Sequence, residues 1–152
     1  MTTSTPPRGT GLELVITRVF NAPRETVWQA WTELERARAW WGPEGFTVPE
    51  LELAEHPGDP WRAVMRSPEG ETFPQHGVLT DASPPERLAF TLIWANDTSR
   101  QEMLVTVTLL EAAGKTAMTF RKGPFHSAVS RWGEEEAWTE AFNRLTALLA
   151  CG

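Results

Sequence analysis

Apolar and polar residues alternate along much of the middle of the chain, which is the pattern of half-buried β-strands. The clearest case is EMLVTVTLLE (102–111), where Met103, Val105, Val107 and Leu109 share one face. Short connections rich in Pro, Gly and polar residues separate the strands, so we expect antiparallel neighbours. The segments predicted as strands are 12–20, 46–54, 61–66, 72–82, 87–95, 102–111 and 116–122.

The apolar spacing changes after the first strand, where two short helices are predicted. Pro23 suits the first position of the first helix, because proline lacks the N–H that this position does not use. Thr32 followed by Glu35 matches a capping box and predicts that a second helix begins there and covers 33–40. Gly42-Pro43 then ends the helix.

The end of the chain carries the strongest helical pattern. Apolar residues fall at i, i+3, i+4, i+7, i+10 and i+11, namely Trp138, Ala141, Phe142, Leu145, Leu148 and Leu149. Such a stripe must lie on another apolar surface. A strand, two short helices, six more strands and a long helix predict an α+β fold in which the sheet closes around the last helix.

The length and the charge restrict the classes of function. A chain of 152 residues predicts one domain, here residues 11–152, after a flexible tail over 1–10. The net charge of −6 and the pI near 5.1 disfavour a nucleic-acid partner and acidic substrates. No membrane span is expected, since no run approaches the ~18 apolar residues that one requires.

Cysteine usage points to a reducing compartment. The single cysteine, Cys151, excludes an internal disulfide, so a cytoplasmic protein is expected. Cys151 is also too close to the end of the chain to be a positioned nucleophile.

Aromatic residues are unusually abundant: eight Trp, seven Phe and no Tyr. The surplus predicts either a very aromatic core or a lined pocket. Trp40 and Trp41 are adjacent, and neighbours on a helix diverge by about 100°. We therefore expect one ring to anchor the helix to the sheet and the other, Trp41, to face the mouth of a cavity.

Several motifs together resemble a known family: Ala22-Pro23, Val27-Trp28, Trp40-Trp41-Gly42-Pro43, Pro84-Pro85-Glu86-Arg87-Leu88 and Trp138. Over about residues 12–150 the chain resembles the branch of the START-like superfamily named after the activator of the ninety-kilodalton heat-shock protein's ATPase. The resemblance implies a helix-grip fold, in which a curved antiparallel sheet of six to seven strands surrounds the C-terminal helix. It also implies a cavity between them, used in the superfamily for lipids, hormones, polyketides and other apolar molecules.

The chain departs from that family's usual pattern at two places. Gly58-Asp59-Pro60 stands where Gly-Gly is usual, which stiffens the hairpin and affects access to that end of the cavity. Ala137 replaces a usual glycine, which favours the long helix by about 1 kcal/mol. The family motif contains no invariant catalytic group, so none is expected from the resemblance.

The histidines give no metal-site pattern, because His56, His76 and His126 lie far apart with no neighbouring cysteine. We expect no metal and no cofactor. His56 is predicted in a solvated turn and His126 at the start of the last helix. His76, inside a strand, is the one histidine expected near the cavity, with an ordinary strand histidine as the alternative.

Two charged clusters are candidate sites by composition. Glu134-Glu135-Glu136 is predicted to be a solvated face at the N-terminal end of a helix. Arg62 and Arg66 share one strand face, which either holds a carboxylate or lies on the exterior, and the exterior is favoured.

The preferred function is a binding module for a small apolar or amphipathic ligand. Its cavity is predicted to be lined by Trp41, Phe46, Trp61, His76, Phe90, Trp94, Met118, Phe120, Trp138 and Phe142. A co-chaperone that stimulates a heat-shock protein ATPase is one alternative. A cyclase, aromatase or hydrolase is another, with His76 or an inward Glu50 or Glu52 as its acid or base. The oligomeric state is open between monomer and homodimer.

Overall fold

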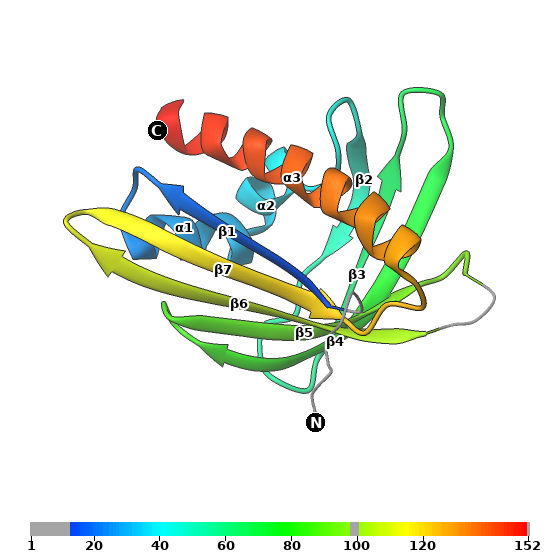
Figure 1. The fold of residues 1–152 in the computed structure, drawn as a ribbon, viewed down its shortest axis with the longest axis horizontal. Helices are drawn as coiled ribbons and strands as arrows, with labels where there is room; N and C mark the ends of the chain where they lie inside the picture. Colours follow the sequence, from blue (N-terminus) through cyan, green and yellow to red (C-terminus); the bar gives the residue numbers. More distant parts are fainter. Residues whose placement is uncertain (1–12, 98–100, 152) are drawn as a thin grey trace.

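The computed structural model describes residues 13–97 and 101–151 (Figure 1). Its elements are, in chain order, β1 (Leu14–Phe20), α1 (Arg24–Thr32), α2 (Leu34–Trp40), β2 (Thr47–Glu52), β3 (Pro60–Arg66), β4 (Thr72–Ser83), β5 (Arg87–Trp94), β6 (Glu102–Ala112), β7 (Lys115–Gly123) and α3 (Ala128–Cys151). Every predicted strand is present, with its ends within two residues of the expected ones. The predicted tail, residues 1–10, lies outside the described residues.

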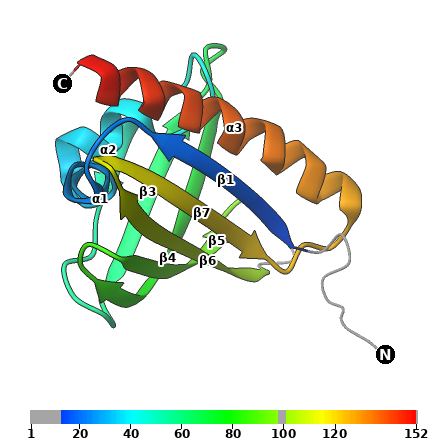
Figure 2. The same cartoon turned by 60° about the vertical axis from the view of Figure 1, so that its left-hand side comes forward.

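Within the described ranges the strands form one seven-stranded antiparallel sheet in the order β1-β7-β6-β5-β4-β3-β2. β1 and β2 follow each other in the chain but lie at opposite edges of the sheet, because α1 and α2 connect them. The sheet curves, and α3 crosses its concave side (Figures 1 and 2). This arrangement confirms the predicted α+β helix-grip fold.

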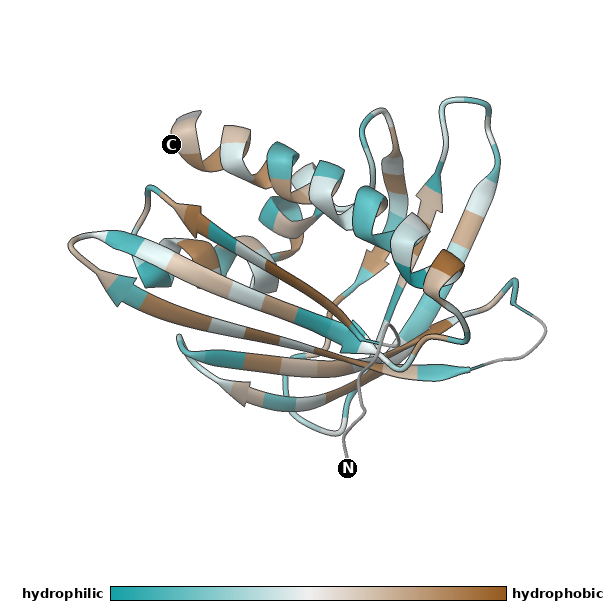
Figure 3. Ribbon diagram, in the orientation of Figure 1, coloured by the Kyte–Doolittle hydropathy of each residue, from teal (hydrophilic) through white to brown (hydrophobic). Residues whose placement is uncertain are grey.

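The core lies between the concave face of the sheet and the helices, and burial follows the predicted faces. Every second residue of β6 from Met103 to Leu109 is buried. On α3, Ala141, Phe142 and Leu145 are buried at the spacing that the sequence predicts. Apolar and polar residues alternate along the strands in Figure 3, so one face of the sheet packs against the helices and the other is more polar.

The helix starts differ from the predictions in two ways. The capping box is wrong, because the Thr32 hydroxyl instead donates a hydrogen bond to Trp28 O at 2.9 Å within α1. Glu33 is the N-cap residue of α2 and makes no side-chain capping bond. Pro23 is the N-cap of α1 and not its first helical residue.

The last helix begins earlier than the predicted glutamate-rich start. Ser127 caps it, since Ser127 Oγ accepts a hydrogen bond from Ser130 N at 3.1 Å. His126 precedes this cap. Glu134 therefore lies inside α3 and not at its N-terminal end, which changes its surroundings completely.

Trp40 and Trp41 are both buried, with ring centroids 5.5 Å apart, but their indoles have different hydrogen-bond partners. The indole of Trp40 is fully buried and donates to Ala30 O at 2.9 Å, so it anchors α2 to α1 and not to the sheet. Trp41 follows the last residue of α2, and Gly42 takes a positive φ of 97° that favours glycine.

Candidate functional site

Four aromatic and five other side chains line a partly open cavity of about 50 Å³ between α1 and the β3–β5 part of the sheet. We call it the aromatic cavity. Its lining consists of Trp31, Thr32, Trp41, Leu53, Ala54, Trp61, Leu79, Leu88 and Phe90. Trp31 is central, because its ring lies 4.7–6.5 Å from the ring centroids of Trp40, Trp41, Phe90, Phe120, Trp138 and Phe142.

A larger hollow adjoins this cavity. The outer groove, of about 650 Å³, lies between the α1–α2 junction, the end of β2 and the β4–β5 turn. Its lining is Trp28, Thr32, Leu34, Leu51, Glu52, Leu53, Ala54, Glu55, Leu79, Ala82, Pro84 and Leu88. Five of these residues also line the aromatic cavity: Thr32, Leu53, Ala54, Leu79 and Leu88.

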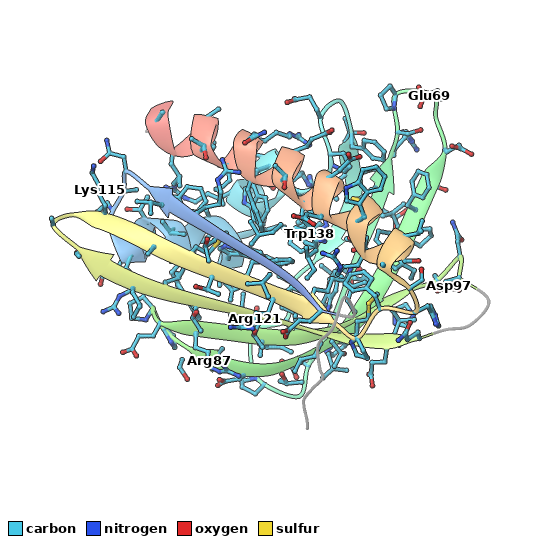
Figure 4. All side chains as sticks on the ribbon, viewed as in Figure 1. Glu69, Arg87, Asp97, Lys115, Arg121 and Trp138 are labelled. Atoms are coloured by element: carbon cyan, nitrogen blue, oxygen red, sulfur yellow. The ribbon has the colours of Figure 1, made fainter. Side chains whose placement is uncertain are left out.

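A second cavity of about 50 Å³ lies beneath α3, and we call it the helix cavity. Its lining is Trp41, Gly42, Pro43, Met65, Gln75, Trp94, Glu134, Ala137, Trp138 and Ala141. Of the described residues, Trp41 alone lines both cavities, so its ring forms the wall between them. Figure 4 shows Trp138 on the side of α3 that faces the sheet.

The position of Trp41 is fixed from two sides. Its indole Nε1 donates to Gln75 Oε1 at 2.7 Å. The guanidinium of Arg144 donates to backbone carbonyls around it, with Nη1 2.9 Å from both Gly42 O and Pro43 O and 3.3 Å from Trp41 O. Arg144 therefore satisfies carbonyls at the end of α2 that the helix leaves unpaired.

Trp61 is held by the backbone of a neighbouring strand. Its indole Nε1 donates to Thr91 O at 2.8 Å, passing over Gly77. A Cβ at Gly77 would lie 1.8 Å from Thr91 O and 2.7 Å from Trp61 Nε1. Only glycine leaves room for this indole to reach β5.

A buried ion pair borders the helix cavity. Lys122 on β7 is 0 % exposed and donates a hydrogen bond to Glu134 Oε1 on α3. Glu134 also accepts hydrogen bonds from the indoles of Trp94, at 2.9 Å to Oε2, and Trp138, at 3.2 Å to Oε1. The Lys122 ammonium lies 5.4–5.8 Å from the ring centroids of Trp94, Phe125 and Trp138.

Desolvation dominates the electrostatics of this pair. Burial lowers the pKa of Lys122 below its ordinary value, while the charge and hydrogen bond of Glu134 act in the opposite direction. The pair is neutral as a unit, which reduces the cost of burying the two charges.

Nine of the ten predicted lining residues, all but His76, fall into four groups. The aromatic cavity is lined by Trp41, Trp61 and Phe90. The helix cavity is lined by Trp94, Trp138 and again Trp41. Phe46 packs on Phe73, with ring centroids 5.9 Å apart. The remaining apolar residues, Met118, Phe120 and Phe142, are fully buried in the core and line neither cavity. Whether the lining residues bind a ligand stays a prediction.

His76 is the exception, and its predicted place near the cavity is corrected. The neighbouring residues Gln75 and Gly77 are buried, so His76 between them belongs to the other face of β4. Its partner in the ladder is Arg62, whose guanidinium bonds the exposed carboxylates of Glu50 and Glu52. Arg62 therefore lies on the exterior face, as favoured, and neither glutamate points inward.

Sequence reasoning missed Lys122, Glu134 and Gln75. Glu134 is not part of a solvated face, because it lies one helical turn before Trp138 on the same side of α3. Lys122 continues the buried alternation of Thr116, Met118 and Phe120 along β7. Both positions follow from the apolar patterns if these are continued to a polar residue: the alternation along β7 leads to Lys122, and the helical spacing before Trp138 leads to Glu134.

Two properties of the described residues bear on the class of site. None of the helices in residues 13–97 and 101–151 is long and apolar enough to cross a membrane. Within the same ranges, no group of three or more His, Cys, Asp or Glu side chains could hold a metal ion.

Comparisons with known proteins agree with the fold. The model of the family described as "Activator of Hsp90 ATPase homolog 1-like protein" matches residues 21–150. No curated protein sequence matches significantly.

Among solved structures, an AHSA1 protein from Silicibacter pomeroyi is 27% identical, with a TM-score of 0.82 over 91% of this chain and 98% of that one. A protein from Rhodobacter sphaeroides is also 27% identical, with a TM-score of 0.80 over 95% of this chain and 97% of that one. A protein from Chromobacterium violaceum shares the fold, with a TM-score of 0.85 at 22% identity over 92% of this chain and 98% of that one. With the family model matching most of its length, the chain belongs to the Activator of Hsp90 ATPase homolog 1-like family.

Proposed function

We propose that this protein binds a small apolar or amphipathic molecule, which lies in the outer groove and places one end in the aromatic cavity. The observation that carries this proposal is that the aromatic cavity and the outer groove have five lining residues in common. Ligand sites are mostly apolar with a few polar groups that orient the ligand. The adjoining hollows have this character.

The sizes of the hollows suggest how a ligand would lie. The aromatic cavity holds about 50 Å³, which is room for a few atoms only. The groove, at about 650 Å³, is large enough for an alkyl chain or a ring system. In this proposal the main body of the ligand therefore lies in the outer groove.

Two polar features favour an amphipathic ligand that is not an acid. The indole N–H of Trp31 is buried and has no hydrogen-bond acceptor among the described residues, so a ligand oxygen in the aromatic cavity could satisfy it. Glu52 and Glu55 line the groove, and the chain has a net charge of −6. An anionic head group would be repelled there.

Native mass spectrometry and thermal shift with three probes test the proposal: 1-decanol, decylamine and decanoate. We expect binding of 1-decanol and decylamine, and weaker binding of decanoate. Ala54→Trp places a bulky ring where the groove and the cavity meet and should weaken binding at least tenfold. Ala117→Trp adds the same ring at an exposed position of β7 and should leave binding unchanged. If none of the probes binds, or if Ala54→Trp binds like the wild type, the proposal is wrong.

The other two hypotheses stay predictions. An enzyme would need an ionisable group at a ligand site. Glu134 lines the helix cavity and Glu52 lines the outer groove, whereas Glu50 lines neither hollow. The co-chaperone hypothesis rests on the family relationship. An ATPase assay with the cognate chaperone tests it directly, because an activator raises the turnover rate at saturating protein.

A further inference from the structure

Trp31 differs from the other tryptophans of the core in its hydrogen bonding. Five described tryptophans donate their indole N–H to an acceptor of the chain, namely Trp40, Trp41, Trp61, Trp94 and Trp138. The Nε1 of Trp31 is buried and has no hydrogen-bond acceptor among the described residues, although the residue is only 3 % exposed. Buried polar groups in folded proteins are nearly always satisfied, so this donor needs an explanation.

The ring of Trp31 borders a hollow that has room for an acceptor. Of the three hollows described above, Trp31 lines only the aromatic cavity, which holds a few atoms. The indoles of Trp40 and Trp41 make edge-to-face contacts with this ring, with centroids 4.7 and 6.1 Å away. A ring face is only a weak acceptor for an N–H group, so these contacts do not replace an oxygen acceptor.

The other polar groups at the aromatic cavity are already used. The donors of Trp41, Trp61 and Thr32, which also line it, are bonded to acceptors of the chain. None of the described lining residues has an ionisable side chain. A charged group would therefore lose its hydration there without gaining a counter-charge. The cavity offers one unused donor, the N–H of Trp31, to an uncharged oxygen.

A carbonyl oxygen matches this donor better than a hydroxyl group does. A carbonyl group accepts hydrogen bonds and brings no proton of its own that needs an acceptor. The proton of a hydroxyl group would need one, and Thr32 is the one lining residue whose side chain has an oxygen. Thr32 also lines the outer groove, so an alcohol bonded to it would lie where the two hollows meet and not at the inner end.

We propose that the ligand is a neutral carbonyl compound, such as a medium-chain ketone, aldehyde or ester, whose oxygen accepts a hydrogen bond from Trp31 Nε1. This inference rests on the proposed function and adds the chemical class of the ligand and the direction in which it lies. The carbonyl end enters the aromatic cavity, and the alkyl chain lies in the outer groove.

The test uses the full chain and two probes of nearly equal shape, 2-heptanone and 2-methyl-1-heptene. The second probe carries a CH₂ group in place of the carbonyl oxygen, so it keeps the apolar contacts and lacks the acceptor. Indole N–H signals in ¹⁵N–¹H spectra, assigned by single Trp→Phe substitutions, report on the binding. We expect 2-heptanone to move the Trp31 signal downfield to saturation, because an N–H that gains an oxygen acceptor is deshielded. The signal should not move downfield with 2-methyl-1-heptene.

The selectivity between the two probes separates the hydrogen bond from the size of the cavity. Trp31→Phe removes the donor and keeps an aromatic ring, so the ratio of the affinities for 2-heptanone and 2-methyl-1-heptene should fall about tenfold. The different hydration of the two probes cancels, because the same ratio is compared in the variant and in the wild type. Trp61→Phe is the matched control. It shortens another indole of the cavity, whose N–H is bonded to Thr91 O, and should keep the wild-type ratio.

Three results would overturn the inference. The first is a Trp31 signal that does not move downfield at saturating 2-heptanone, and this result decides the question alone if Trp31→Phe does not fold. The second is an unchanged ratio in a folded Trp31→Phe variant. The third is an equal fall of the ratio in Trp61→Phe, which would assign the effect to the size of the cavity. The proposed function survives all three if 1-decanol or decylamine binds, whereas the failure of every probe to bind overturns both.

Discussion

The ion pair between Lys122 and Glu134 allows a sharp prediction about stability. Glu134→Gln keeps the shape of the side chain but leaves the fully buried Lys122 ammonium without a counter-charge. Removing one partner of a buried pair costs about 3–5 kcal/mol, so we expect a loss of that size at neutral pH. Lys122→Met should cost less, about 1–3 kcal/mol, because the Glu134 side chain is 20 % exposed and keeps two indole donors.

The effect should depend on pH in a defined direction. Burial lowers the folded-state pKa of Lys122 below its ordinary value of 10.5. Between these two pKa values the unfolded chain binds more protons, so the free energy of unfolding rises with pH. The negative charge of Glu134 counteracts this lowering. Removing that charge lowers the folded-state pKa of Lys122 further, so the interval between the two pKa values extends towards neutral pH. The stability of Glu134→Gln should therefore rise more steeply with pH than that of the wild type.

Urea denaturation between pH 7 and pH 10 measures both effects. Few other groups titrate in this range, since the chain has no tyrosine, one cysteine and one other lysine, Lys115. Glu136→Gln is the matched control, because Glu136 is exposed on the same helix. The reasoning is refuted if Glu134→Gln lies within about 0.5 kcal/mol of the wild type at pH 7, the usual range for surface changes. The reasoning is also refuted if Glu134→Gln lowers the free energy of unfolding by less than Lys122→Met does.

Two other substitutions have expected outcomes. Phe142→Ala should lower the free energy of unfolding by about 3–5 kcal/mol, because Phe142 is fully buried in the core, and a loss below about 1 kcal/mol would contradict this role. Gly77→Ala should cost more than about 3 kcal/mol, because the added Cβ would lie 1.8 Å from the backbone oxygen of Thr91, and thermal unfolding should show a lower Tm. The Trp61 indole N–H signal should shift in the same variant, whereas an unchanged signal and Tm would show that the strands move apart freely.

The sequence predicts the elements of this fold well because each is encoded by neighbours in the chain. The alternation along β6 and the stripe along α3 are local patterns, and the structure follows both. The capping box was wrong for a local reason as well. A threonine hydroxyl near a helix end has two possible partners, and Thr32 bonds the carbonyl of Trp28.

The polar part of the candidate site is harder to predict because its residues come from distant segments. Lys122 meets Glu134 across the gap between β7 and α3, and Gln75 meets Trp41 from the other side of the helix cavity. A shift of one position along a strand exchanges its two faces, so the sequence pattern of β4 predicts His76 on the inward face, where the structure has Gln75. Pairings of this kind are set by the tertiary fold.

The position of Trp31 has an optical consequence. Its ring lies within 6.5 Å of three other indoles, those of Trp40, Trp41 and Trp138. Excitation can pass between indoles at such separations, so light absorbed by one of them is emitted by the group. A ligand in either cavity should thus change a shared emission, and fluorescence alone would not reveal which cavity is occupied.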